Sequence, residues 1–236
     1  MKVDLFEDNV GAVEYVSHMG SDLTVVNAAR VSFGVEKQNL DEKDINLINY
    51  LMKHNHTSPF EHCAITLRFT VPLFIRSQHH RHRTWAYNEI SRRYTDVDLR
   101  FYEPKKFRTQ HKSNRQASSE TLINPDMNDA TTRMVPVPAY HASEAVRMHN
   151  IKSLNLYNSL LEKGVCREQA RGVLPQNLYT QYYGTVNLHN LLKFVNLRIH
   201  EGAQWEIQKV AKACLAIAKE YFPESVNSYM RKNKME

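Results

Sequence analysis

The chain has 236 residues, a net charge of +6 and 42% hydrophobic residues, an ordinary composition for a globular protein that can bury a core. It holds no apolar run of the roughly 20 residues that a membrane helix needs and no secretory signal pattern at its N-terminus, and its three widely spaced cysteines form no C-x-x-C pair. We therefore expect a cytoplasmic protein without disulfides or structural zinc, whose positive charge favours anionic partners.

The first half of the chain predicts strands and one clear helix. Residues 12–16 and 23–26 are short apolar runs and are the weaker strand candidates. Residues 41–55 begin with an Asp suited to an N-cap and place apolar residues on one helical face. Residues 65–71 alternate strictly between apolar and polar, which predicts a half-buried strand. Pro72 then suits the first turn of a helix that leads into a basic stretch.

The second half is mostly helical in pattern. Residues 101–138 are polar and contain four prolines, which predicts a long surface loop or insertion. Beyond it, the periodicity predicts helices over about 141–163, 167–174 and 207–221. Together these elements indicate an α+β fold with a strand-bearing N-terminal half and a helical C-terminal half. We expect residues 1–236 to form a single domain.

A basic stretch is the first feature that points to chemistry. Between Arg76 and Arg93 the chain has eight Arg or His residues and one acid, Glu89. None of the seven glycines forms a G-x-G pattern, so side chains must replace the glycine-rich backbone of common nucleotide sites. Arginine forks can do this because they meet phosphate oxygens bidentately. From the charge pattern alone, a solvated basic surface is as good an explanation as a phosphate-binding site. The presence of Asn88, Glu89 and Ser91 inside the stretch favours the binding site.

The same stretch resembles a family motif. Residues 81–93 are similar to R-H-R-x-x-S-x-N-E-x-S-x-R, which marks the flavin-dependent thymidylate synthases, and Ala86 stands where the motif has Ser. The other seven specified letters match at Arg81, His82, Arg83, Asn88, Glu89, Ser91 and Arg93. Six further segments resemble the family, at residues 29–33, 56–62, 171–175, 177–180, 196–198 and 203–207. The likeness extends from about residue 32 to residue 207, interrupted by the polar segment.

The resemblance implies a specific enzyme activity. Members of this family are methyltransferases that convert dUMP to dTMP. They take the carbon from methylenetetrahydrofolate and the reducing hydride from FAD, which NADPH reduces. The resemblance also implies a homotetramer with active sites shared between subunits, and no nucleic-acid or membrane partner.

The resemblance also implies the site residues. The expected dUMP site consists of Gln78, Arg81, Glu89, Ile90, Ser91, Arg92, Arg93, Arg171 and Arg198. The expected FAD site consists of Ser32, Ser58, Arg81, His82, Arg83, Glu89, Asn187, His189 and Lys193. His189 and Lys193 differ from the residues that relatives often carry, although both can donate to a phosphate.

Two of the expected residues are catalytic. Arg198 would lie at the uracil edge and stabilise the negative charge that develops on the ring, which a fixed guanidinium does without reorganising. His56 would lie near the flavin ring. The flavin carries the redox step and the protein orients it, so no cysteine nucleophile is required.

Two other classes of protein remain as alternatives. A nucleic-acid-binding protein could use the basic stretch on phosphates, and its binding would weaken steeply with salt. The carboxylate of Glu89 disfavours this class, because a negative charge among the arginines repels nucleic-acid phosphates. A metal-dependent hydrolase could use the histidines at positions 54, 56, 62, 79, 80 and 82.

The histidine and cysteine patterns argue against a metal centre or a thiol nucleophile. The chain has no H-E-x-x-H motif, and H-x-x-E-H fails because Ser58 stands at its first position. We therefore expect no metal site. Cys63 and Cys214 are expected to be packing residues. Cys166 has a basic neighbour, Arg167, which could lower its pKa, but we do not expect it to be catalytic.

Overall fold

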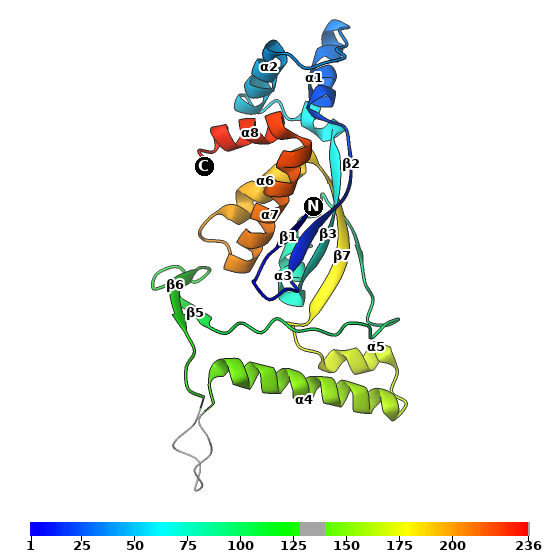
Figure 1. The fold of residues 1–236 in the computed structure, drawn as a ribbon, viewed down its shortest axis with the longest axis vertical. Coiled ribbons are helices and arrows are strands. Elements are labelled where there is room, and N and C mark those ends of the chain that lie inside the picture. The colour runs from blue at the N-terminus through cyan, green and yellow to red at the C-terminus, as the bar shows by residue number, and fades with distance from the viewer. Residues whose placement is uncertain (128–139, 236) are drawn as a thin grey trace.

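A five-stranded antiparallel sheet forms the centre of the molecule, in the order β1-β2-β3-β7-β4 (Figure 1). This computed structural model describes residues 1–127 and 140–235. The strands are β1 (Lys2–Asp4), β2 (Ala12–Met19), β3 (Ala64–Pro72), β4 (Ala86–Glu89) and β7 (Tyr179–Asn187). β3 and β7 pair along their full length, from Ala64 opposite Asn187 to Pro72 opposite Tyr179.

Strand β3 alternates in burial from Ala64 to Phe69, as its sequence predicts, and is fully buried beyond that. Its apolar side chains Ile65, Leu67, Phe69 and Val71 are buried in the main core. The predicted strand at residues 65–71 is therefore confirmed, and so is the weaker candidate at residues 12–16, which lies in β2.

The strand expected at residues 23–26 is wrong, because this segment belongs to helix α1 (Asp22–Arg30). A capping box between Ser21 and Thr24 starts the helix, and Val25 and Val26 then fall on its buried face. A run of four apolar residues does not distinguish a strand from a buried helical turn. Here the cap decides in favour of the helix.

The two helices that the sequence predicts in the first half are both present. α2 (Glu42–Lys53) begins at Asp41, whose carboxylate accepts the backbone N–H of Asp44 at 3.0 Å. α3 (Leu73–His79) follows β3 directly, with Pro72 at its N-cap. Two short 3-10 turns, η1 (Val31–Phe33) and η2 (Ser58–His62), connect these elements.

Of three C-terminal helices, two lie against the sheet and the last packs on α2 and on the helix that precedes it (Figure 1). They are α6 (Leu188–Ile199), α7 (Trp205–Tyr221) and α8 (Pro223–Lys232). The helix predicted over residues 207–221 is confirmed as α7. The sequence interpretation missed α6, α8 and β7, so the mostly helical second half also supplies a central strand.

The long helix α4 (Ala142–Glu162) lies at the end of the molecule away from α1 and α2 (Figure 1). It confirms the helix predicted over residues 141–163. α5 (Arg167–Ala170) and the 3-10 turn η3 (Arg171–Val173) occupy the segment predicted as one short helix. A small core of Tyr157, Ala170, Leu174 and Leu178 joins them to the rest.

The polar segment is not only a loop. Within the range expected to be a surface loop or insertion it contains a two-stranded hairpin, β5 (Phe107–Gln110) and β6 (Ser118–Ile123). Cross-strand pairs hold the hairpin, including a hydroxyl hydrogen bond between Thr109 and Ser119 at 2.5 Å. Residues 128–139 of the expected loop lie outside the described residues.

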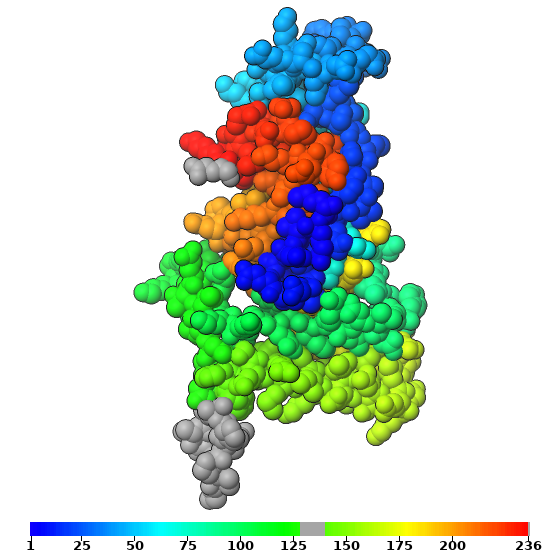
Figure 2. Space-filling model, in the orientation of Figure 1, coloured from blue at the N-terminus to red at the C-terminus, as the bar shows by residue number. Residues whose placement is uncertain are grey.

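The hairpin stands apart from the N-terminal segment, with a hollow of about 800 Å³ between them (Figure 2). The wall contains both acids and bases, including Glu7, Asp8, Lys105 and Arg115. Because these charges offset one another, this hollow has no preference for an anion.

The main core draws on both halves of the chain, from Leu5 and Val13 to Val226 and Tyr229. This continuity supports our proposal that the described residues form one domain. None of the described helices is long and apolar enough to cross a membrane.

Candidate functional site

A pocket of about 320 Å³ lies between α3, β4 and η3 and contains much of the expected dUMP site. Five of the expected residues line it: Glu89, Ile90, Ser91, Arg92 and Arg171. Apolar side chains of Leu73, Leu174 and Leu178 form the remainder of the wall together with Arg76 and Thr180. The pocket therefore combines an apolar surface with hydrogen-bonding and cationic groups.

Glu89 is held in a defined position at the end of β4. Its Oε1 accepts a hydrogen bond from Thr180 Oγ1 at 2.7 Å and lies 3.2 Å from Arg76 Nε. Arg76 offsets the negative charge of Glu89, so the carboxylate adds a hydrogen-bond acceptor without making the pocket anionic. Neither Arg76 nor Thr180 was among the expected site residues.

Arg92 is used to hold the chain after β4. Its guanidinium donates to the backbone oxygens of Val97 and Asp98 at 2.6 and 3.4 Å. Burial lowers the pKa of the Arg92 guanidinium, although it stays charged. In this chain Arg92 shapes the pocket wall, and its fork is not free for a phosphate.

Arg171 lines this pocket, and both Arg171 and Arg93 contact Glu168. Arg171 Nε donates to the backbone oxygen of Glu168 at 3.3 Å, and Arg93 Nε lies 3.5 Å from Glu168 Oε2. These exposed contacts contribute little stability. The two terminal nitrogens of the Arg171 guanidinium make no hydrogen bond among the described residues, so they can meet an anion.

His82 and Arg198 connect the basic stretch to α6. Arg198 Nε donates to His82 Nε2 at 3.0 Å. His82 must be neutral to accept this bond. Its pKa is lowered to about 4, mainly by burial and then by the charges of Arg198 and Lys193. With Nε engaged, the two terminal nitrogens of Arg198 remain as a fork for a ligand.

His79 anchors this region in the core. It is fully buried, and its Nδ1 lies 2.8 Å from the Tyr182 hydroxyl. Aromatic rings of Phe69, Trp85 and Phe194 surround it. Burial lowers the pKa of His79, so the ring is neutral and serves packing. Within residues 1–127 and 140–235, no three His, Cys, Asp or Glu side chains are grouped to hold a metal.

Other expected residues of the basic stretch face outward. Gln78 on α3 donates to the Gln204 side chain. Arg81 and Arg83 are exposed, and neither side chain makes a hydrogen bond or ion pair among the described residues. These two guanidinium groups are available to a ligand or to a second copy of the chain.

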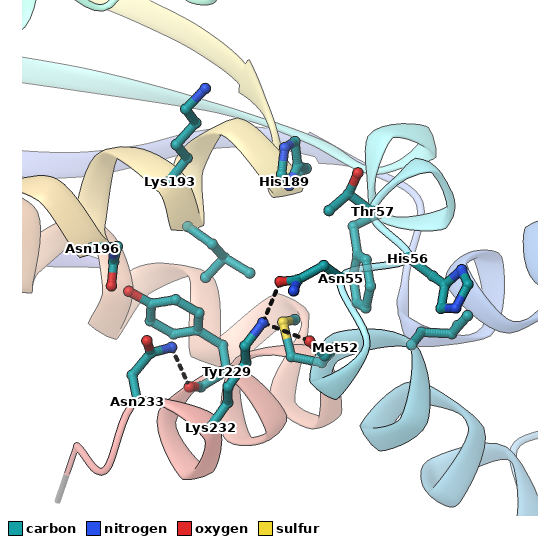
Figure 3. A pocket seen from close by; sticks show the side chains of 13 residues that line it. Met52, Asn55, His56, Thr57, His189, Lys193, Asn196, Tyr229, Lys232 and Asn233 are labelled. Atoms are coloured by element: carbon teal, nitrogen blue, oxygen red, sulfur yellow. Dashed lines mark hydrogen bonds between the residues drawn. The ribbon is translucent and has the colours of Figure 1, made fainter.

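A second cavity, of about 280 Å³, lies between α2, η2, α6 and α8 (Figure 3). It contains three residues of the expected FAD and catalytic sets: His56, His189 and Lys193. His56 stacks on Tyr50 with ring centroids 5.9 Å apart. Asn187 starts α6, because its Oδ1 accepts the backbone N–H of Asn190 at 2.9 Å.

The two expected serines lie outside both pockets. Ser32 is exposed in η1 and donates to the backbone oxygen of Ala29 at 3.1 Å. Ser58 is exposed at the start of η2. Among the described residues, neither side chain makes a hydrogen bond to another expected FAD residue.

The cysteines have the environments of packing residues. Cys63 and Cys214 are buried, and burial raises the pKa of both thiols, that of Cys63 to about 12. Cys63 donates to the backbone oxygen of Ser21 at 3.3 Å. Cys166 is exposed and lines neither pocket.

The comparisons with known proteins agree with this geometry. The family model described as thymidylate synthase complementing protein matches residues 14–224. The flavin-dependent thymidylate synthase of Thermus thermophilus is 45% identical over 213 residues, which cover 90% of this chain and 73% of the relative. The chain belongs to the flavin-dependent thymidylate synthase family. The family member of Thermotoga neapolitana is 40% identical over 231 residues, covering 98% of this chain and 95% of the relative.

Solved structures of a related methylase share the family fold. PolB from Streptomyces cacaoi, a UMP/dUMP methylase bound with 5-Br dUMP, is 31% identical with a TM-score of 0.79 and 97% coverage of both chains. The same protein bound with 5-Br UMP gives 29% identity, a TM-score of 0.78 and 99% coverage of both chains. The expected α+β arrangement of a flavin-dependent thymidylate synthase is thereby confirmed.

The family resemblance predicts several residues that line the two pockets, but not the residues that support them. The structure brings Glu89, Ile90, Ser91, Arg92 and Arg171 to one pocket, and His56, His189 and Lys193 to another. Arg198 lies apart from both pockets, against His82. Arg76 could have been suspected from its place in the basic stretch, whereas Thr180 lies on a strand that the sequence did not reveal.

Proposed function

We propose that this chain methylates dUMP to dTMP, with methylenetetrahydrofolate as the carbon donor, FAD as the cofactor and NADPH as the source of the hydride. The pocket around Glu89 and Arg171 is the observation that carries the proposal. Membership of the flavin-dependent thymidylate synthase family and the nucleotide-bound PolB structures support it.

The pocket has the groups that a nucleoside monophosphate requires. Its volume of about 320 Å³ suits a small ligand. Arg171, with its terminal nitrogens free, binds the phosphate at the rim, and Arg93 adds charge there. Glu89 and Ser91 supply hydrogen-bonding groups deeper in the pocket. Arg76 keeps Glu89 from repelling the anion.

Arg198 activates the uracil ring. The hydrogen bond to His82 fixes the guanidinium, so its remaining fork is oriented before the ligand arrives. A fixed positive charge stabilises the negative charge that develops on the ring during methylation. FAD, when bound, supplies the hydride that completes the new methyl group.

The cavity beside α6 fits an anionic cofactor. Its lining includes the cationic side chains Lys193 and Lys232, and none of the described residues that line it is acidic. Asn187, His189 and Lys193 would hold FAD along α6. His56 would lie at its flavin side.

A second copy of the chain completes the site in our proposal. Thr180 in the first pocket and Asn187 beside the second cavity are seven residues apart on β7, a separation of about 23 Å in an extended strand. Flavin and uracil must touch for the hydride to pass. Exposed Arg81, Arg83 and Ser58 supply surface groups that a neighbouring subunit's ligand can use, which supports a homotetramer with shared sites.

The visible spectrum of the purified protein tests the cofactor proposal. We expect a flavin spectrum, either as isolated or after reconstitution with FAD, and bleaching by NADPH that dUMP alters. A protein that stays colourless after incubation with FAD and gel filtration would contradict the proposal. Binding to nucleic acid that weakens steeply with salt would then favour the alternative class.

A further inference from the structure

The cavity in Figure 3 has a wall that contains none of the expected site residues. Helix α8 contributes Tyr229 and Lys232 to it, and its C-cap residue Asn233 adjoins them, across the cavity from α6. The family motifs quoted above end at residue 207, so they do not reach this helix. The α8 wall, meaning these three residues, therefore needs its own explanation.

The Tyr229 hydroxyl is the decisive atom of the α8 wall. Tyr229 is only 5% exposed, and its hydroxyl has no hydrogen-bond partner among the described residues. Burial raises the pKa of the Tyr229 hydroxyl to about 12, so the group is protonated and can donate. Figure 3 shows it at the cavity, on the side of Asn196. A buried polar group without a partner is costly, which points to a ligand that pairs with it.

The rest of the α8 wall is already fixed in place. Lys232 Nζ donates to Met52 O at 2.8 Å and to Asn55 Oδ1 at 2.6 Å. Asn233 Nδ2 donates to Tyr229 O at 2.9 Å. The side-chain oxygen of Asn233 and the side-chain amide of Asn196 have no described partner, so both are available to hydrogen-bond a ligand.

The remaining lining of the cavity is apolar, and the volume of the cavity limits the size of the ligand. Leu51, Met52, Phe60 and Leu192 are all buried beside the cavity. The volume of about 280 Å³ is at the lower limit for ligand pockets, which run from about 300 to 1,000 Å³. The cavity therefore accepts one ring system with a polar edge, and it cannot contain a whole dinucleotide.

We propose that the α8 wall binds the adenine ring of FAD, with the Tyr229 hydroxyl hydrogen-bonded to the ring edge. Adenine is flat and uncharged, and its edge offers both donors and acceptors. The attached phosphates then leave the cavity along α6, where Lys193 extends away from Tyr229 (Figure 3). This inference rests on the proposed function, because it assumes that FAD is the cofactor.

Titration of the apoprotein with three ligands tests the inference. Tyr229→Phe is expected to weaken FAD binding about three- to tenfold, the effect of one lost hydrogen bond. ADP, measured as a competitor of FAD, should lose the same factor. FMN, which lacks adenine, should bind both proteins equally. Asn196→Ala, at an exposed helical position, should likewise weaken the binding of FAD and ADP and leave the binding of FMN unchanged.

A matched control removes a similar hydroxyl elsewhere. Tyr157, on α4, is fully buried, and its hydroxyl also lacks a described partner. Tyr157→Phe should bind FAD like the wild type. Unchanged FAD and ADP affinity in Tyr229→Phe, or an equal loss of FMN affinity, overturns the adenine assignment alone. A wild-type protein that binds no FAD overturns both this inference and the proposed function.

Discussion

Single side chains with an oriented charge carry most of the proposed chemistry. His82 accepts the Nε proton of Arg198 and leaves the guanidinium fork free. Glu89 is neutralised by Arg76 and fixed by Thr180. In both cases a neighbouring side chain determines what the expected site residue can do. Ala86, the one departure from the motif, is exposed on β4, and nothing in the structure explains it.

Removal of the Arg198 guanidinium should stop turnover without removing the cofactor. In Arg198→Ala we expect kcat for dTMP formation to fall by at least about 100-fold, as for other groups that stabilise developing charge. Bound FAD, measured by absorbance, should stay at the wild-type level. Arg147→Ala, an exposed arginine on α4, is the control and should keep normal activity. Normal turnover in Arg198→Ala would contradict the assignment.

The protonation of His82 should make stability depend on pH. Its pKa is about 4 in the folded protein against an ordinary value of 6.5, so the unfolded chain binds the proton more readily. The free energy of unfolding should therefore fall as pH decreases from about 6.5 to 4.

The variant His82→Gln isolates this contribution, because Gln can accept from Arg198 and does not titrate. We expect a shallower loss of stability with acid in His82→Gln, measured by urea unfolding at several pH values. His79 and His80, whose pKa values are also lowered, remain in both proteins and cancel in the comparison. Identical slopes in the two proteins would show that His82 is not neutral in the folded state.

At the level of elements, local pattern predicts β3 and α2 but not β7. In β3 each second residue is apolar, whereas β7 includes Thr180, Thr185 and Gly184, and its burial comes from pairing on both sides with β3 and β4. Gly184 is required by packing, because a Cβ there would lie 2.9 Å from the Phe69 ring. A tertiary contact of this kind leaves no trace in local periodicity.

The boundary between β7 and α6 is hidden in the sequence for a related reason. Asn187 ends the strand and caps the helix, so no loop separates them. The candidate site shows the same division between local and tertiary information. The motif residues could be predicted from the family pattern, while the α8 wall and Thr180 depend on elements that meet only in the folded chain.

The start of α8 depends on a residue of α1. The buried carboxylate of Asp22 accepts the backbone N–H groups of Glu224 and Ser225 at 2.8 and 2.9 Å, and the Ser225 hydroxyl at 2.5 Å. We expect Asp22→Ala to lower the free energy of unfolding by about 2 kcal/mol, because buried donors lose their acceptor.

Urea unfolding at fixed protein concentration measures this effect. Asp4→Ala, which removes an exposed ion pair with Lys2, is the control and should change stability by less than about 0.5 kcal/mol. Because α8 forms one wall of the second cavity, Asp22→Ala should also weaken FAD binding. Wild-type stability in Asp22→Ala would show that α8 is anchored in another way.

At the scale of the whole molecule, the two pockets lie near opposite ends of β7, and we propose that neighbouring subunits combine them. Mixing two inactive variants tests this. Arg171→Ala and Arg198→Ala are each expected to be inactive. If one subunit supplies Arg171 and another supplies Arg198, random mixed oligomers should regain about a quarter of the wild-type sites. No recovery after subunit exchange, verified by mass-tagged subunits, would place both residues in one subunit's site.

The formation of dTMP from dUMP by the FAD-loaded protein tests the central claim most directly. The reaction would contain NADPH and methylenetetrahydrofolate with a deuterated methylene carbon, and mass spectrometry would follow the nucleotide. We predict dTMP that carries the two deuterium atoms, formed only when all four components are present. Unchanged dUMP with the FAD-loaded protein, or labelled dTMP formed equally well without FAD, would contradict the account.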